Sequence, residues 1–286
     1  MVASLYMGAK LMANAMVVFK ADRPANNPNL PKLEITQQEI DILNMNPSAW
    51  LEAKSGVVSS GGDVSLVRDK TGRARWVPVA ALAPRIISVG KGFALRFGRA
   101  ASNSGALIAQ GGYESLPADG IYSQFILYRI PLPNTEGYGG TGGNICGNYT
   151  TVPDWLRVRF GNDSFQSDIV WINHGDTAAS IPSNYPINTV IPGFRDNQWH
   201  IAAIEATSTY HRWEHDGALL QQSTIPAAPF LTAASRQLLI GGAGNPLRQG
   251  FQGDIAAKIT VPSVLSVDAK NTLYARFNAL KAELQG

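Results

Sequence analysis

Residues 196–220 read DNQWHIAAIEATSTYHRWEHDGALL. The run that begins at Trp199 is dominated by apolar residues, as expected of a strand, and a second, more polar run carries Trp213. Asp216 and Gly217 close the second run, and this pair tolerates the positive φ angles that a tight hairpin turn demands. The segment therefore predicts two adjacent strands that end in a hairpin turn.

A further strand signal lies in residues 251–261, FQGDIAAKITV. With a period of two, one face would carry mainly apolar residues: Phe251, Gly253, Ile255, Ala257, Ile259 and Val261. The other face would carry Gln252, Asp254, Lys258 and Thr260. Strand-like runs also occur at PRIISV, YSQFILYRI, SDIVWIN and RQLLIGG, separated by Gly, Pro, Asn and Asp. Many short strands without interleaved helices predict an all-β antiparallel sandwich.

Two segments carry helix signals. Thr36 and Glu39 have the spacing of a capping box, which opens a short helix that Pro47 must end. Near the C-terminus an apolar stripe with helical spacing predicts an amphipathic helix over residues 268–285. Its members are Leu273, Phe277, Leu280 and Leu284. We expect this helix to pack on the sandwich or to pair with a copy of itself.

The chain divides into three parts. The sequence predicts a docking arm or hairpin in residues 1–20 and a Pro- and Asn-rich linker with the short helix in residues 21–48. It predicts the sandwich in residues 49–286. The apolar residues of the arm are Leu5, Tyr6, Met7, Leu11, Met12, Val17, Val18 and Phe19. Gly8 and Lys10 interrupt them, so we expect neither a signal peptide nor a membrane span. Because a terminal hairpin buries too little apolar surface to be stable alone, the arm predicts a partner protein or a homo-oligomer.

The amino-acid composition excludes several classes of protein and of site. Charged residues make up 16% of the chain, hydrophobic residues 45%, and the net charge is +3, so neither disorder nor a nucleic-acid partner is expected. Cys146 is the only cysteine, which excludes a disulfide within the chain and a thiolate metal site. We expect Cys146 to be an incidental thiol in a Gly-rich loop.

Three patches, in order along the chain, resemble the concanavalin A-like lectin/glucanase superfamily and above all its laminin G-like members. The first patch consists of Trp50, Leu51, Ala53, Asp69 and Gly72, and the second of Gln198, Trp199, His200, Asp216 and Gly217. The third contains Ile-Gly-Gly at 240–242, Phe-x-Gly-x-Ile at 251–255 and Leu-Ser at 265–266. The resemblance covers residues 49–286 and implies an antiparallel jelly-roll. Val67 and His215 depart from the family's pattern, which argues against transferring a ligand site.

The resemblance raises the question of catalysis. Retaining glucanases of the superfamily carry a Glu-x-Asp-x-x-Glu motif on one strand, and the motif is absent from this sequence. Glu205 and Glu214 lie on successive predicted strands and are the alternative catalytic pair. We expect a solvated face there and predict a protein with no catalytic residues.

No cofactor or metal is predicted. His211 and His215 are four residues apart, and on a strand this spacing separates the side chains by roughly 13 Å, too far to share an ion. Calcium stays the alternative, since relatives use oxygen ligands in loops at the sandwich rim. Asp163 and Asp168 are the candidates for such a site.

A sugar-binding surface would combine aromatic rings with amides and carboxylates. The candidate residues are Tyr138, Tyr149, Trp155, Trp171, His174, Asp176 and Tyr185. Trp171 is as well placed for a core role as for a ligand contact.

An apolar arm, a linker and a laminin G-like sandwich together resemble phage tail, fibre or head-decoration proteins. This resemblance implies a structural and recognition protein of the virion, made in the host cytoplasm. Its partners would be other virion proteins through the arm and a surface glycan through the jelly-roll, with no nucleic acid and no membrane. The alternatives are a glycan-active enzyme of the same fold, either a glycoside hydrolase or a lyase, and a free soluble lectin.

Overall fold

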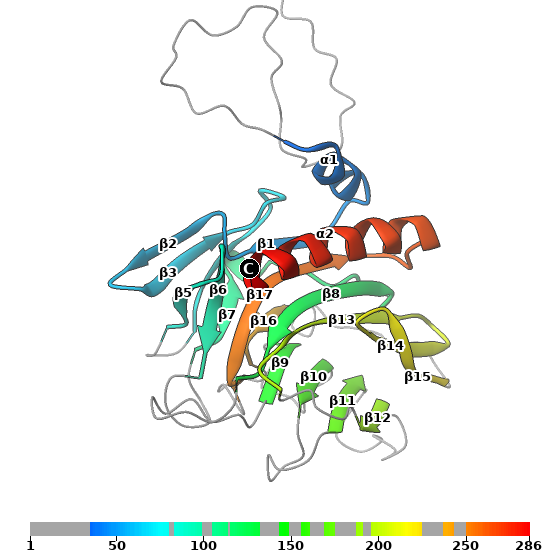
Figure 1. Ribbon diagram of the computed structural model, residues 1–286. Helices are drawn as coiled ribbons and strands as arrows, with labels where there is room; N and C mark the ends of the chain where they lie inside the picture. Colours follow the sequence, from blue (N-terminus) through cyan, green and yellow to red (C-terminus); the bar gives the residue numbers. More distant parts are fainter. Residues whose placement is uncertain are drawn as a thin grey trace, which may run out of the picture.

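The computed structural model describes residues 35–79, 83–98, 105–113, 115–131, 143–148, 156–160, 169–174, 187–190, 196–224, 237–242 and 250–286. These residues form antiparallel strands, with one helix at each end of the described chain (Figure 1). The early strands are β1 Ala49–Glu52, β2 Val57–Ser60, β3 Asp63–Arg68, β4 Arg75–Pro78, β5 Arg85–Val89, β6 Gly92–Phe97, β7 Leu107–Ala109, β8 Tyr122–Arg129 and β9 Gly143–Asn148. The later strands are β10 Leu156–Phe160, β11 Ile169–His174, β12 Ile187–Val190, β13 Trp199–Ala206, β14 Tyr210–His215, β15 Ala218–Thr224, β16 Leu238–Ile240 and β17 Gly253–Val261.

The strands are arranged in two layers. In the first layer β17 pairs with β1 and β6 along one edge and with β8 along the other, and β13, β14 and β15 follow β8. The second layer runs β3, β4, β7, β16, β9, β10, β11 and β12. β5 pairs with β6 of the first layer and also contacts β3 of the second, which joins the layers at one side. β2 pairs with β3. This architecture confirms the predicted antiparallel sandwich of the jelly-roll type.

The central strands of the first layer, β17, β8 and β13, are buried on both faces. The inner face of this layer packs on the second layer around Trp76, Tyr128 and Trp213. Its outer face packs on α2, Val267–Gln285, which lies across β17, β8 and β13 (Figure 1). The apolar stripe of α2 is buried as predicted, with Leu273 and Phe277 fully covered. The helix therefore packs on the sandwich.

The short helix α1, Gln37–Asn44, begins with the predicted capping box at Thr36 and Glu39. Its Ile42 is fully buried in the same outer core as α2. Within the described residues, neither helix is long and apolar enough to cross a membrane. The arm residues, from Leu5 to Phe19, lie outside the described part of the chain.

One prediction about β17 is wrong. A bulge between Ile255 and Ala257 breaks the alternation, so the apolar residues before and after it lie on opposite faces. Ile255 belongs to the inner core, whereas Ile259 belongs to the outer core with α2. Lys258, predicted on a polar face, pairs in register with Leu51 and Ile126 and is 1% exposed inside the sandwich.

Candidate functional site

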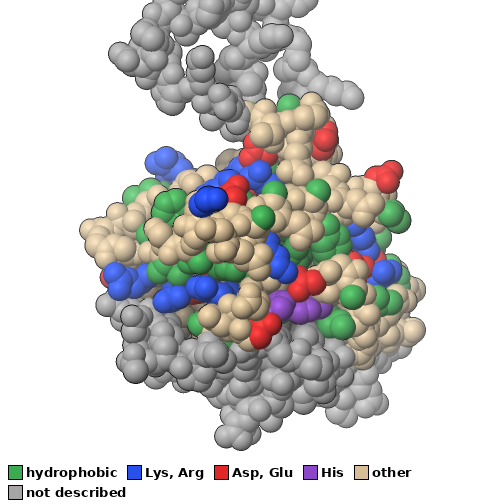
Figure 2. All heavy atoms as spheres, viewed as in Figure 1, with side chains coloured by type: hydrophobic (Ala, Val, Ile, Leu, Met, Phe, Trp, Pro, Cys, Tyr) green, Lys and Arg blue, Asp and Glu red, His purple; other side chains and the backbone are tan. Residues whose placement is uncertain are grey.

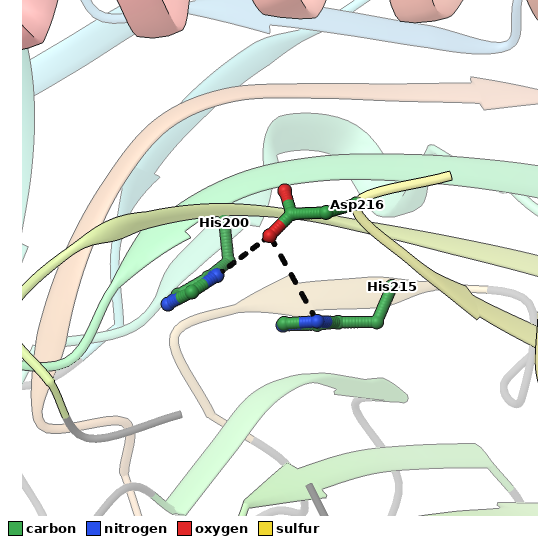
Figure 3. Close-up of side chains that lie close together, drawn as sticks. All are labelled: His200, His215 and Asp216. Carbon is green, nitrogen blue, oxygen red and sulfur yellow. Dashed lines mark hydrogen bonds and ion pairs between the residues drawn. The ribbon is translucent and has the colours of Figure 1, made fainter. Parts of the chain in front are cut away.

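The predicted hairpin turn is present and creates a polar cluster at one end of the first layer. Asp216 and Gly217 connect β14 to β15 with φ angles of 48° and 85°, the left-handed conformation that this dipeptide accepts. Ala202 pairs with His215, so the start of β13 and the end of β14 lie side by side. His200 and His215 are thereby brought together beside Asp216 (Figure 3).

His200 lies between two carboxylates. Its Nδ1 is 2.8 Å from Oδ2 of Asp216, and its Nε2 is 3.0 Å from Oδ1 of Asp196. The other oxygen of Asp216 accepts hydrogen bonds from the backbone N–H of Ile201 at 2.9 Å and from Nζ of Lys281 in α2 at 3.0 Å. The orientation of Asp216 is therefore fixed by a strand, a helix and a histidine together.

His215 completes the cluster. Its ring stacks on that of His200, with centroids 4.7 Å apart and an interplanar angle of 29°. Its Nδ1 is 3.9 Å from Oδ2 of Asp216, and its Nε2 is 3.1 Å from the hydroxyl of the buried Tyr128. Each imidazole thus has one nitrogen directed to Asp216 and the other bound by an outer partner.

The pKa values of the two histidines are shifted in opposite directions. Burial lowers the pKa of His200, but hydrogen bonds with Asp216 and Asp196 outweigh it and the pKa is raised. Burial, with the neighbouring His200, lowers the pKa of His215 to about 4. Although burial alone would raise the pKa of Asp216, hydrogen bonds from His200, Ile201 N–H and Lys281 hold it well below its usual range. At neutral pH the Asp216 carboxylate is therefore charged and the His215 ring is neutral, whereas His200 holds its proton more tightly than an ordinary histidine.

This cluster reaches the surface. Figure 2 shows histidine side chains exposed beside acidic and basic groups. One ligand atom from each of His200, His215 and Asp216 lies within 4.8 Å of the others. The set can exchange protons or hold a cation.

Sequence reasoning missed this cluster because it tested spacing only along one strand. His211 and His215 are on the same strand, and only His215 joins the cluster. The one available signal was the predicted adjacency of the two strands. In the observed register Ala202 lies opposite His215, so His200 is the diagonal neighbour of His215 on the same face, and the sequence did not specify this register.

A second polar cluster lies on the outer face of the same strands and contains Glu205 and Glu214. Both are covered by α2, with 4% and 6% exposure. Lys270 of α2 lies 3.1 Å from Oε2 of Glu205 and 3.4 Å from Oε1 of Glu214. Tyr210 donates to Glu205 at 2.6 Å and Tyr274 donates to Glu214 at 2.8 Å. The expectation of a solvated face is wrong, because the helix buries both carboxylates.

The hydrogen bond to Glu205, with burial, raises the pKa of Tyr210 to about 12. Beside the pair is a cavity of about 10 Å³, room for at most one water molecule. The two carboxylates thus serve mainly to attach α2 to the sheet.

Most of the residues predicted to bind sugar or calcium lie outside the described part of the chain. These are Tyr138, Tyr149, Trp155, Asp176 and Tyr185, together with Asp163 and Asp168. Trp171 and His174 lie in β11, where backbone pairing places them opposite Arg159 and Leu156. Cys146, predicted in a loop, lies in β9 and is fully buried in the inner core.

Comparison with known proteins identifies the fold and no sequence family. No protein-family model and no curated protein matches the chain. Among solved structures, domain 4 of an extracellular GH43 arabinanase from Geobacillus stearothermophilus, in complex with arabinotriose, matches with a TM-score of 0.52 and 12% identity. The match covers 82% of this chain and 98% of that one.

Botulinum neurotoxin type C, whose cell entry depends on two ganglioside molecules, matches with a TM-score of 0.53 and 12% identity over 84% of this chain and 53% of that one. Trypanosoma rangeli sialidase matches with a TM-score of 0.52 and 12% identity over 81% of this chain and 33% of that one. The chain thus spans about half of the toxin chain and a third of the sialidase. At identities this low, the structural matches establish a shared β-sandwich fold alone.

Proposed function

We propose that this chain is a non-catalytic recognition module that binds glycans through its sandwich and is attached to a phage virion by residues 1–20. The similar sandwiches support the glycan part of the proposal, since one was solved with arabinotriose and another belongs to a toxin that depends on gangliosides. Both ligands are sugars or carry sugars.

The observation that carries the non-catalytic part is the burial of Glu205 and Glu214. Hydrolysis of a glycosidic bond needs one carboxyl group that donates a proton and another that attacks or activates water, both in contact with the substrate. Here Lys270 bridges the two carboxylates and α2 covers them. A sugar could reach them only if the helix left the sheet, which favours binding over cleavage.

The virion in the proposal comes from the resemblance of the arm, linker and sandwich to phage tail, fibre and decoration proteins, and the start of the described chain supports only the attachment through residues 1–20. α1 is attached to the domain through Ile42, and Glu39 of α1 pairs with Arg276 of α2 at 3.3 Å. A segment that precedes α1 is therefore connected to a fixed point on the helix-covered face. The apolar residues 1–20 could dock on a particle from this point.

A glycan array probed with the full chain tests the proposed recognition. We expect retention of a defined set of oligosaccharides and loss of that retention in Tyr138→Ala or Tyr185→Ala. Glu205→Gln and Glu214→Gln should leave retention unchanged. Neither the wild type nor these variants should cleave a retained glycan. Cleavage of a retained glycan that either Gln variant abolishes would establish the enzyme alternative instead.

Deletion of residues 1–20 tests the attachment. The expected result is a folded protein that still binds its glycan but no longer joins its particle, with a changed oligomeric state by light scattering. A truncated chain that assembles as before would contradict the docking role and favour a free lectin.

A further inference from the structure

We propose that His200, His215 and Asp216 form a binding site for a divalent transition metal ion of the zinc type. This inference is independent of the proposed function. It depends on the positions of three side chains that the β13–β14 pairing and the Asp216-Gly217 turn bring together.

The ligand spacing fits such an ion. Zinc lies about 2.0–2.1 Å from imidazole nitrogen and carboxylate oxygen, so two ligands of a tetrahedral site are about 3.3 Å apart. The distances from Asp216 Oδ2 to Nδ1 of His200 and of His215 are 2.8 and 3.9 Å, on either side of that value. The three ligand atoms lie within 4.8 Å of one another, so the stacked rings must turn toward Asp216 and their nitrogens approach by up to about 1.5 Å to share one ion.

The outer contacts are those of a metal site. Metal-bound histidines commonly donate their second N–H to a carboxylate, carbonyl or water, which fixes the ring and its tautomer. His200 has Asp196 at 3.0 Å from its Nε2, and His215 has the Tyr128 hydroxyl at 3.1 Å. Both Nδ1 atoms are thereby directed to the same oxygen of Asp216 (Figure 3).

The ligand chemistry selects the ion. Two imidazoles and one carboxylate suit zinc and its neighbours, whereas calcium prefers oxygen ligands alone. Three protein ligands leave a fourth position, which water or a ligand oxygen can fill. On binding, the metal takes the place of the proton between His200 Nδ1 and Asp216, and that proton passes to the buffer.

One neighbour opposes the ion. Nζ of Lys281 lies 3.0 Å from Oδ1 of Asp216, so its positive charge repels a bound dication. Lys281→Met should therefore tighten metal binding, whereas the ligand variants should weaken it.

The experiment uses the full chain, freed of tags and stripped with EDTA, and titrates ZnCl2 by isothermal calorimetry. We expect one zinc per chain and affinity weakened on the order of 100-fold in His200→Gln, His215→Gln and Asp216→Asn. Asn is chosen because it tolerates the left-handed φ of 48° at this turn. His211→Gln, four residues away on β14 and outside the cluster, is the matched control and should bind as the wild type does.

Tyr128→Phe is a second test that still applies if the ligand variants fail to fold, because it removes the hydroxyl that contacts His215 and leaves all three ligands in place. It should weaken zinc binding by about 10-fold without changing the stoichiometry. CoCl2 provides a spectroscopic readout, because tetrahedral cobalt absorbs strongly in the visible and hydrated cobalt does not. Absence of zinc binding to the wild type, or binding that all three ligand variants retain, would overturn the proposal.

Discussion

Arg276 of α2 donates two hydrogen bonds to the carboxylate of Glu52 in β1, from Nε to Oε1 at 3.0 Å and from Nη2 to Oε2 at 2.7 Å. Glu52 is 1% exposed and also accepts from Trp50 Nε1 and Lys70 Nζ. Hydrogen bonds and nearby positive charge hold the pKa of Glu52 below its ordinary value although burial alone would raise it. A paired charge under the helix therefore connects α2 to the first strand of the sandwich.

Arg276→Met should destabilise the fold. Removal of one partner leaves a buried carboxylate without its main counter-charge, which costs about 3 kcal/mol or more. The measurement is the free energy of unfolding in urea at pH 7. The matched control is Lys54→Met, because Lys54 pairs with Glu283 of the same helix at 3.0 Å but both side chains are over a third exposed. Its loss should stay below about 1 kcal/mol, and equal losses in the two variants would contradict the prediction.

Lys258→Met should stabilise the fold. The ammonium of Lys258 is buried inside the sandwich and donates to Thr260 Oγ1 at 2.7 Å. An apolar side chain of similar length removes the desolvation cost of the charge and loses one hydrogen bond. We expect a net gain of about 1–2 kcal/mol in the free energy of unfolding at pH 7. A loss of similar size would mean that the hydrogen bond outweighs the buried charge.

The same lysine predicts a pH dependence. Burial lowers the pKa of Lys258 to about 8, although Cys146 and Asp69 favour the charged form, and in the unfolded chain the pKa is 10.5. Between pH 8 and 10.5 the unfolded state binds more protons, so this group makes stability rise with pH. Below pH 8 both states are protonated and the cost of the buried charge is fully present.

Urea unfolding of the wild type and Lys258→Met at pH 7.5 and pH 10 isolates this contribution, because other groups titrate alike in both proteins. The stability advantage of the variant should be largest at pH 7.5 and smaller at pH 10. An advantage that does not change with pH would show that Lys258 keeps an ordinary pKa.

Local signals in the sequence predicted much of this fold. The turn at Asp216 and Gly217, the capping box of α1 and the apolar stripe of α2 each depend on residues close together in the chain. Their conformations follow from backbone sterics and helical periodicity, so the sequence was sufficient.

Long-range pairing determined what the sequence could not predict. The bulge after Ile255 arises where β17 meets β8, and it places Lys258 inside the sandwich. Likewise His200 and His215 meet only because β13 and β14 pair in one register. Such relationships belong to two strands at once, and a pattern read along one strand cannot reveal them.

Gly241→Ala tests how tightly the layers meet at the end of β16. Gly241 has a φ of 81°, and an added Cβ would lie 2.2 Å from Cδ1 of the buried Phe97. Its backbone is held on both sides, since its N–H donates to Ile145 O and its carbonyl accepts from Phe251 N–H, each at 2.8 Å. The clash therefore cannot be relieved by a small shift of the chain.

We expect Gly241→Ala to lower the free energy of unfolding by about 2–4 kcal/mol, from left-handed strain and overpacking together. Gly72→Ala is the control, because Gly72 has a φ of 74° with no atom within 4 Å of the added Cβ. It should cost about 1 kcal/mol from strain alone. Thermal unfolding followed by circular dichroism separates the two variants, and equal melting temperatures would mean that Phe97 can move aside.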